Sequence, residues 1–330
     1  MFSNKTFAEF LKKSGKGQEA ATEAMRVVED YQAFLSQKGV NDERDITVKD
    51  TVDYLVKNRV DSDDIDHIIQ ILREYAYSIH HEEVCSELDN MHYIYGITEK
   101  MSNLIREIHG EDVWRQVFGD ADMPKPGCTL DEATDFTREM DARMSQILPR
   151  EQCECVYVQN GHGWQPGWDS GYDRKLFLEL QSIDKLIQRY NDNLINELET
   201  CRDEGKLFYT QECDDEVVAY MKANPSCTRI GNKIRLQKIP FLTKKYLHEK
   251  DNTRKRFYAC HCPLKRNSIL QEKGSLSRSL CNCSLGHDKK KFDLAFGREL
   301  TGRVVESVMD ADSLRCVFEI ELPDDLMKNV

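Results

Sequence analysis

The chain has 330 residues, of which 40% are hydrophobic and 32% are charged, a balance that is ordinary for globular proteins. It contains no run near the ~18 apolar residues that span a bilayer, and its start lacks the apolar segment of a secretory signal. These features exclude a membrane protein and predict a cytoplasmic location. In that reducing compartment the 12 cysteines are expected to be thiols or metal ligands rather than disulfides.

The charge is distributed unevenly along the chain. Residues 1–120 carry 14 basic and 24 acidic side chains, a net charge of −10. Residues 229–303 carry 19 basic and 6 acidic side chains, a net charge of +13. The basic segment predicts that the protein binds a small anionic molecule. The alternative is a solvated basic face that docks on the acidic N-terminal part.

The length is sufficient for roughly two domains, and the sequence pattern separates them. Residues 1–118 have apolar side chains at helical spacing and predict an acidic helical bundle, a scaffold or a docking site for a protein partner. Residues 119–128 contain prolines and glycines and predict a linker. Residues 129–330 predict an α+β domain with a small antiparallel sheet. The expected fold class is therefore α+β.

Local signals give the elements of the second domain in order. Thr129 and Glu132 have the spacing of a capping box at a helix start. Further expected elements are a long helix at 174–202, a short helix at 215–223, a hairpin turning at Gly231–Asn232, a strand at 257–262, a helix at 289–296 and two closing strands. Between the first two helices, a glycine-rich loop (153–168) carries Cys153, Cys155, His162 and Trp164, and predicts a binding loop.

The candidate site is a cysteine-rich segment within the basic part. Cys260 and Cys262 form one Cys-x-Cys unit, and Cys281 and Cys283 form a second one after 18 intervening residues. On strands, residues i and i+2 share a face, so four thiolates are expected to converge. Soft sulfur ligands in tetrahedral geometry favour zinc, with an iron–sulfur cluster as the second choice.

Basic and histidine side chains next to these cysteines complete the predicted site. Arg266 and Arg278 are candidate anion anchors, because a guanidinium matches a carboxylate or phosphate bidentately. Lys265 and Trp164 are further candidates for contact with the ligand. His261, His287 and His162 are expected as acid–base groups or as groups supporting the metal ligands.

Two other functions follow from the same residues. Without a metal, neighbouring cations would lower the pKa of a thiol, and Cys281 would be the nucleophile of a thiol-dependent hydrolase or a redox enzyme. A zinc module that binds nucleic acid is a weaker alternative, because few aromatic residues interleave with the basic ones. The structural alternative is that the cysteines are simply buried, since they pack as small apolar side chains.

Residues 214–323 resemble a family of bacterial proteins, mostly from anaerobic Firmicutes, described as a domain of unknown function. The residues that carry the resemblance are Lys238-Ile239-Pro240, Cys260-His261-Cys262-Pro263, Cys281-Asn282-Cys283-Ser284-Leu285-Gly286, Val305-Glu306-Ser307-Val308 and Arg315-Cys316-Val317-Phe318.

The C-terminal end is also similar to vinyl-reductase-like (4VR) small-ligand-binding domains, which end in a helix and two strands that carry one cysteine each. Cys316 matches the second of those cysteines, whereas Ser307 stands near the position of the first. A looser likeness to the aminothiazoline-carboxylate hydrolase family implies thiol-dependent hydrolysis of a small anionic compound.

Overall fold

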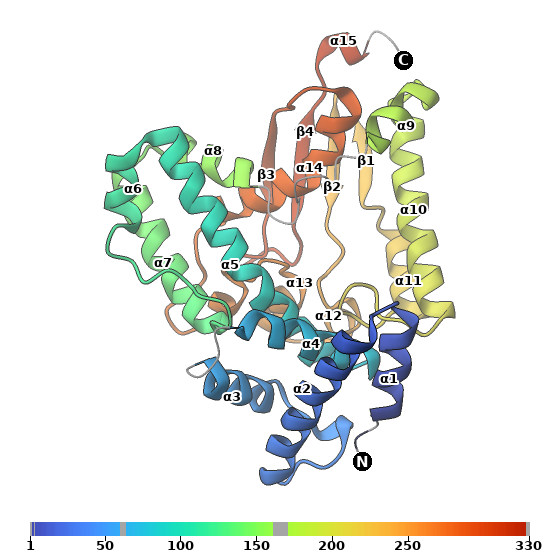
Figure 1. Cartoon of the computed structure of the whole chain (residues 1–330). Coiled ribbons are helices and arrows are strands. Elements are labelled where there is room, and N and C mark those ends of the chain that lie inside the picture. The colour runs from blue at the N-terminus through green and yellow to red at the C-terminus, as the bar shows by residue number, and fades with distance from the viewer. Residues whose placement is uncertain (1, 3, 60–63, 161–170, 328–330) are drawn as a thin grey trace.

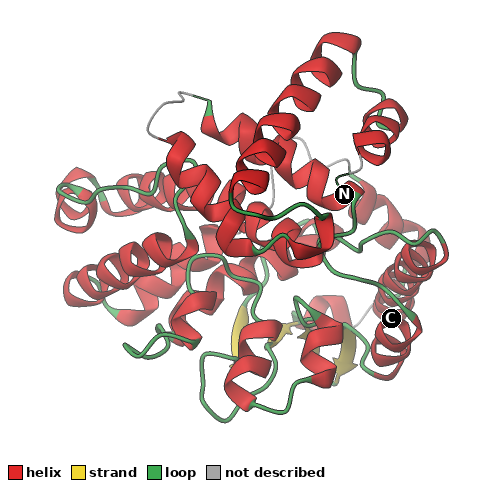
Figure 2. Ribbon diagram, turned by 90° about the horizontal axis from the view of Figure 1, so that it is seen from below, coloured by secondary structure: helices red, strands yellow, loops and turns green. Residues whose placement is uncertain are grey.

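The computed structural model describes residues 2, 4–59, 64–160 and 171–327. The fold is α+β, as predicted: helices surround one small antiparallel sheet (Figures 1 and 2). In Figure 1 helices α1–α4 lie at one end of the molecule and the sheet lies toward the other, so the two chain ends are far apart. No helix in the described ranges combines the length and the apolar character needed to cross a bilayer.

The N-terminal part is helical, as expected. Its elements are α1 (Asn4–Lys13), α2 (Gln18–Gln37), η1 (Glu43–Asp45), α3 (Val48–Arg59), α4 (Ile65–Ser78), α5 (Glu82–His109) and α6 (Glu111–Phe118). Residues 119–129, which include the predicted linker, form neither helix nor strand.

The remaining elements begin at the predicted capping box, in which Thr129 and Glu132 each accept the other's backbone N–H. They are α7 (Leu130–Ile147), α8 (Arg150–Asn160), α9 (Tyr172–Leu180), α10 (Ile183–Asp203), α11 (Asp215–Ala223), β1 (Cys227–Ile230), β2 (Lys233–Gln237), α12 (Thr243–His248), α13 (Asn252–Ala259), η2 (Arg266–Ile269), η3 (Arg278–Cys281), α14 (Asn282–Phe296), β3 (Gly302–Glu306), β4 (Val317–Glu321) and α15 (Asp324–Met327).

The sheet has the strand order β1-β2-β4-β3, and every pair is antiparallel. The predicted hairpin is confirmed, with Gly231 at a φ of +60° in its turn. One face of the sheet is buried through Ile234, Leu236, Phe318 and Ile320, which pack against α9, α10 and α14. The opposite face carries ion pairs, such as the one between Arg303 and Glu319. A half-covered antiparallel sheet has this alternation.

Helix α14 crosses α8 at very close range through Gly286. A Cβ atom added at Gly286 would lie 1.9 Å from the carbonyl oxygen of Val158, which is far inside van der Waals contact. The absence of a side chain at this position is therefore what brings the cysteine-bearing start of α14 against α8.

Three expectations about local structure were wrong. The helix expected at 174–202 is two helices, α9 and α10, because Gln181 has a φ of +47° and Ser182 caps α10. The strand expected at 257–262 is instead the end of helix α13, up to Ala259, followed by a loop; Asp251 caps the start of this helix. The loop expected from residue 153 is helical up to Asn160 (α8), and residues 161–170 lie outside the described ranges.

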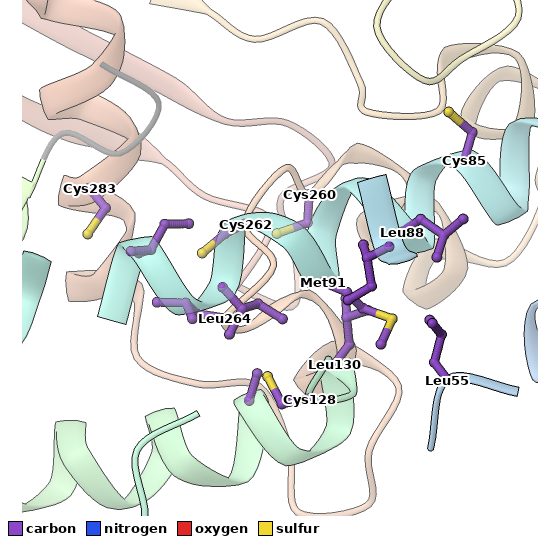
Figure 3. Packing of buried hydrophobic residues seen from close by; sticks show 14 of the residues in the cluster. Leu55, Cys85, Leu88, Met91, Cys128, Leu130, Cys260, Cys262, Leu264 and Cys283 are labelled. Atoms are coloured by element: carbon purple, nitrogen blue, oxygen red, sulfur yellow. The ribbon is translucent and has the colours of Figure 1, made fainter. Parts of the chain in front are cut away.

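The largest hydrophobic core joins the N-terminal helices to the cysteine-rich segment. Leu88 and Met91 of α5, Leu130 of α7, and Cys260 and Cys262 all belong to it (Figure 3). The division at residues 119–128 therefore separates two stretches of sequence that share one core. The domain boundaries themselves stay a prediction.

Candidate functional site

The four cysteines of the two Cys-x-Cys units are buried, but they do not lie on paired strands. Cys260 follows α13, Cys262 lies in the next loop, Cys281 ends η3, and Cys283 lies in the first turn of α14. Figure 3 shows Cys260 and Cys262 beside α5, whereas Cys283 lies apart from them on α14. The premise that residues i and i+2 share a face therefore fails here, because neither unit is extended into a strand.

A lysine ammonium group, rather than a metal position, lies among these thiols. Lys265 is only 2% exposed, and its Nζ donates a hydrogen bond to the Sγ of Cys281 at 2.7 Å. Burial by itself would lower the pKa of Lys265, but the surrounding thiols of Cys281, Cys262 and Cys260 raise it above its ordinary value. The lysine is therefore charged at neutral pH inside the core.

Cys281 makes a second hydrogen bond, with Ser307 in the connection that follows β3. Its Sγ lies 2.9 Å from the Oγ of Ser307. The same Oγ accepts the backbone N–H of Met309 at 3.0 Å, so Ser307 joins Cys281 to the chain that follows β3. The sulfur of Cys281 thus makes two polar contacts, one with the ammonium group of Lys265 and one with the hydroxyl group of Ser307.

The neighbouring thiols are held in the protonated form. Burial raises the pKa of Cys260 to about 11, and that of Cys283 and Cys316 to about 12. Burial also raises the pKa of Cys262. The nucleophilic form of a cysteine is the thiolate, so these four sulfurs are poor nucleophiles at neutral pH.

The metal-ligand geometry expected from the sequence does not form among the residues that the structure describes. Within those ranges, no group of three or more His, Cys, Asp or Glu side chains is arranged to hold a metal ion. A zinc site built from Cys260, Cys262, Cys281 and Cys283 would require these side chains to move together and Lys265 to leave its position between them.

Two of the predicted histidines lie close together near the cysteines. His261 Nε2 donates to the carbonyl oxygen of Ile239 at 2.6 Å, and its ring meets Phe241 edge-on. Burial, reinforced by Lys238, Arg266 and His287, lowers the pKa of His261 well below its ordinary value. The imidazole of His261 is therefore neutral at pH 7, and these two contacts hold it in place. The predicted His162 and Trp164 lie outside the described residues.

Arg266 and Arg278, the two predicted anion anchors, lie in different surroundings. Arg278 donates to the carboxylate of Asp310 at 2.9 Å and to the carbonyl oxygens of Val304 and Val305. These contacts join η3 to the strand-bearing tail. The guanidinium of Arg278 is thus already engaged within the fold.

Arg266 lies on the wall of a cavity of about 670 Å³ between the N-terminal helices and the C-terminal part. Residues of α3, α5, α7, α12, α13 and η2 line this cavity. Its volume falls within the range of small-molecule sites, about 300–1,000 Å³. The predicted scaffold therefore supplies one wall of the cavity, a contribution that the sequence pattern did not predict.

The side chain of Arg266 is buried, 4% exposed, between two aromatic rings. Its guanidinium carbon lies 4.1 Å from the ring centroid of Phe257 and 4.6 Å from that of Phe241. Its Nε donates to the carbonyl oxygen of Phe257 at 3.0 Å. Burial lowers the pKa of Arg266 to about 10, so the group remains cationic at neutral pH. Within the described ranges no carboxylate forms an ion pair with it.

Glu87 of α5 lines the same cavity and was not singled out by the sequence. Burial raises its pKa to about 7, although the nearby Arg266 opposes this shift. Lys245, also at the cavity, forms ion pairs with Glu82 and Glu83 of α5. These carboxylates lie on a helix of ordinary composition, so no local sequence signal marks them.

The resemblance to 4VR domains compares Ser307 and Cys316 with the two cysteines on the closing strands of those domains. Both residues lie next to the buried Cys281. Ser307 contacts Cys281, and the thiol of Cys281 contributes to the raised pKa of Cys316. The family resemblances remain predictions from the sequence. No protein-family model, no curated protein and no solved structure matches this chain.

Proposed function

We propose that the protein binds a small anionic molecule with an apolar body in the cavity between α3, α5 and η2, and that Arg266 anchors the anionic group. The observation that carries the proposal is the buried guanidinium of Arg266 at the cavity wall, without an ion-pair partner among the described residues. A buried charge is costly unless it is paired, so the guanidinium favours an anionic partner.

The composition of the cavity wall supports a carboxylate ligand. Apolar side chains of Val48, Val52, Leu130, Leu242 and Leu270 line much of it. A planar guanidinium donates two parallel hydrogen bonds to a carboxylate, which fixes its orientation. An aliphatic or aromatic carboxylate would place its charged group on the guanidinium of Arg266 and its apolar body against these side chains.

Glu87 makes the expected affinity depend on pH. Because burial raises its pKa to about 7, the carboxyl is largely protonated below that value and donates a hydrogen bond to the anion. Above that value it is charged and repels the anion. The affinity for a carboxylate is therefore expected to fall as the pH rises through about 7.

Titration calorimetry with benzoate and hexanoate as probes tests the proposal. Arg266→Met is expected to weaken binding about tenfold or more, since a lost charge-assisted hydrogen bond is worth about 1.5–3 kcal/mol. Arg254→Met is the matched control, because it removes an exposed cation of α13 that does not line the cavity. Leu270→Trp, which fills the cavity, should abolish binding with Arg266 intact.

Two results would contradict the proposal. One is equal loss of affinity in Arg254→Met and Arg266→Met, which would indicate a general charge effect. The other is undiminished binding in Leu270→Trp, which would place the probe elsewhere.

The zinc site remains a second proposal, supported by four buried cysteines and the half-buried Cys316, all near Lys265. An iron–sulfur cluster is the less favoured occupant. A thiol-dependent enzyme would use Cys281, the cysteine whose sulfur contacts both Lys265 and Ser307. This residue is 3% exposed, so the core would have to open for it to meet a substrate.

A nucleic-acid partner is supported less well, because many basic side chains of residues 229–303 are paired with carboxylates. Lys245 pairs with Glu83, and Lys273 pairs with Asp135. These pairs also fit the alternative in which the basic part docks on the acidic helices. The twelve free cysteines support the proposed cytoplasmic location.

A further inference from the structure

The contact between Lys265 and Cys281 is unusually short for a hydrogen bond to sulfur. Nζ and Sγ are 2.7 Å apart, a separation typical of charge-assisted N–H···O bonds, which measure about 2.7–2.9 Å. Sulfur is larger than oxygen, so an ordinary N–H···S contact is longer. A nitrogen and a sulfur that are each singly bonded to the same oxygen atom lie at about the observed separation.

Both partners are confined where they are. Lys265 and Cys281 are 2% and 3% exposed, and Nζ is held by Cys281. The nearby Asp141 interacts with Lys265 electrostatically, but its own carboxylate accepts the hydroxyl of Tyr157. The backbone of Lys265 bonds to that of Cys262, and Cys281 is held by Ser307. Two reactive groups held at contact distance react as if at very high concentration.

We propose that Lys265 and Cys281 form a covalent nitrogen–oxygen–sulfur bridge when the protein meets dioxygen. The ammonium group of Lys265 releases one proton to solvent and loses one further N–H bond, and Cys281 loses its S–H bond, while one N–O bond and one O–S bond form. The second oxygen atom leaves as water. Nitrogen and sulfur each give up two electrons, and dioxygen takes up all four. Two molecules of a dithiol reductant, each oxidised to its disulfide, supply the four electrons that restore the lysine and the thiol and release the bridging oxygen as water.

The bridge is a modification site and a redox switch in the core. It joins the loop that begins η2 to the end of η3, and so it fixes the residue that precedes Arg266. A covalent link between residues 265 and 281 closes a loop of the chain and is expected to raise Tm. This inference is independent of the ligand proposed for the cavity.

Mass spectrometry of the full-length protein tests the proposal. Protein purified without oxygen and protein exposed to air are denatured, alkylated with iodoacetamide and weighed. The reduced chain should take up label on all 12 cysteines. The air-exposed chain should take up one label fewer and, apart from the labels, gain one oxygen atom and lose two hydrogen atoms. A dithiol should restore the twelfth label.

A peptide map of air-exposed wild type should show the segments that contain Lys265 and Cys281 joined, and it requires no variant. Lys265→Met should keep all of its thiols in air, whereas Cys262→Ser, which removes a neighbouring buried thiol, should still form the bridge.

Three results would overturn the proposal. The first is full labelling of the air-exposed wild type. The second is the loss of two labels without added oxygen, which would indicate a disulfide. The third is an oxygen adduct that persists in Lys265→Met.

Discussion

Replacing Gly286 by alanine tests the close crossing of α14 and α8. The added Cβ would lie 1.9 Å from the carbonyl oxygen of Val158, whereas ordinary contacts begin at 3.4 Å, so the helices must separate by about 1.5 Å. Overpacking between two backbones costs about 3 kcal/mol, and the better helix propensity of alanine returns about 1 kcal/mol. The expected net loss of unfolding free energy is about 2 kcal/mol.

Gly96 provides the matched control within α5. It is a helical glycine whose added Cβ meets no atom within 4 Å. Gly96→Ala is therefore expected to stabilise the protein by up to about 1 kcal/mol through helix propensity alone. The same substitution should thus have opposite signs at the two sites.

Urea unfolding followed by circular dichroism measures both effects as shifts of the midpoint at constant slope. A Gly286→Ala protein as stable as wild type, or more stable, would refute the inference that α14 and α8 touch backbone to backbone. If Gly96→Ala destabilised the protein by a similar amount, the loss of stability in Gly286→Ala would come from the loss of a glycine and not from the helix crossing.

Three further outcomes are expected. Glu87 holds its proton to about pH 7 in the fold but only to about 4.5 when unfolded, so stability should fall as the pH rises through this window. Other buried carboxyls with raised pKa values contribute in the same direction, so the Tm profile of Glu87→Gln should be flatter than that of wild type. Iodoacetamide should label the exposed Cys155 of the folded protein well before Cys260 or Cys283, and rapid labelling of Cys281 would instead favour the thiol enzyme. Elemental mass spectrometry of anaerobically purified protein should find about one zinc per chain if the second proposal holds. Loss of the metal in both Cys260→Ser and Cys281→Ser would assign it to these thiols, and a metal-free wild type would end that proposal.

Local signals were sufficient wherever a few neighbouring residues determine the backbone. The capping box of Thr129 and Glu132 and the turn at Gly231 are confirmed, because each depends on contacts within four residues. The fold class followed from hydrophobic periodicity in the same way. The single helix expected at 174–202 was wrong because the left-handed residue Gln181 carries no sequence signal.

The site was only partly predictable. The sequence alone identified the cysteine-rich segment and Arg266 as the anion anchor that we propose. Only the tertiary structure placed Lys265 among the thiols, set Ser307 against Cys281, and brought Glu87 of α5 to the cavity that Arg266 lines. Spacing along a chain determines which residues share an element, but contacts between elements far apart in sequence depend on how the elements pack. The burial that keeps Cys260, Cys262 and Cys283 protonated was decided at that level.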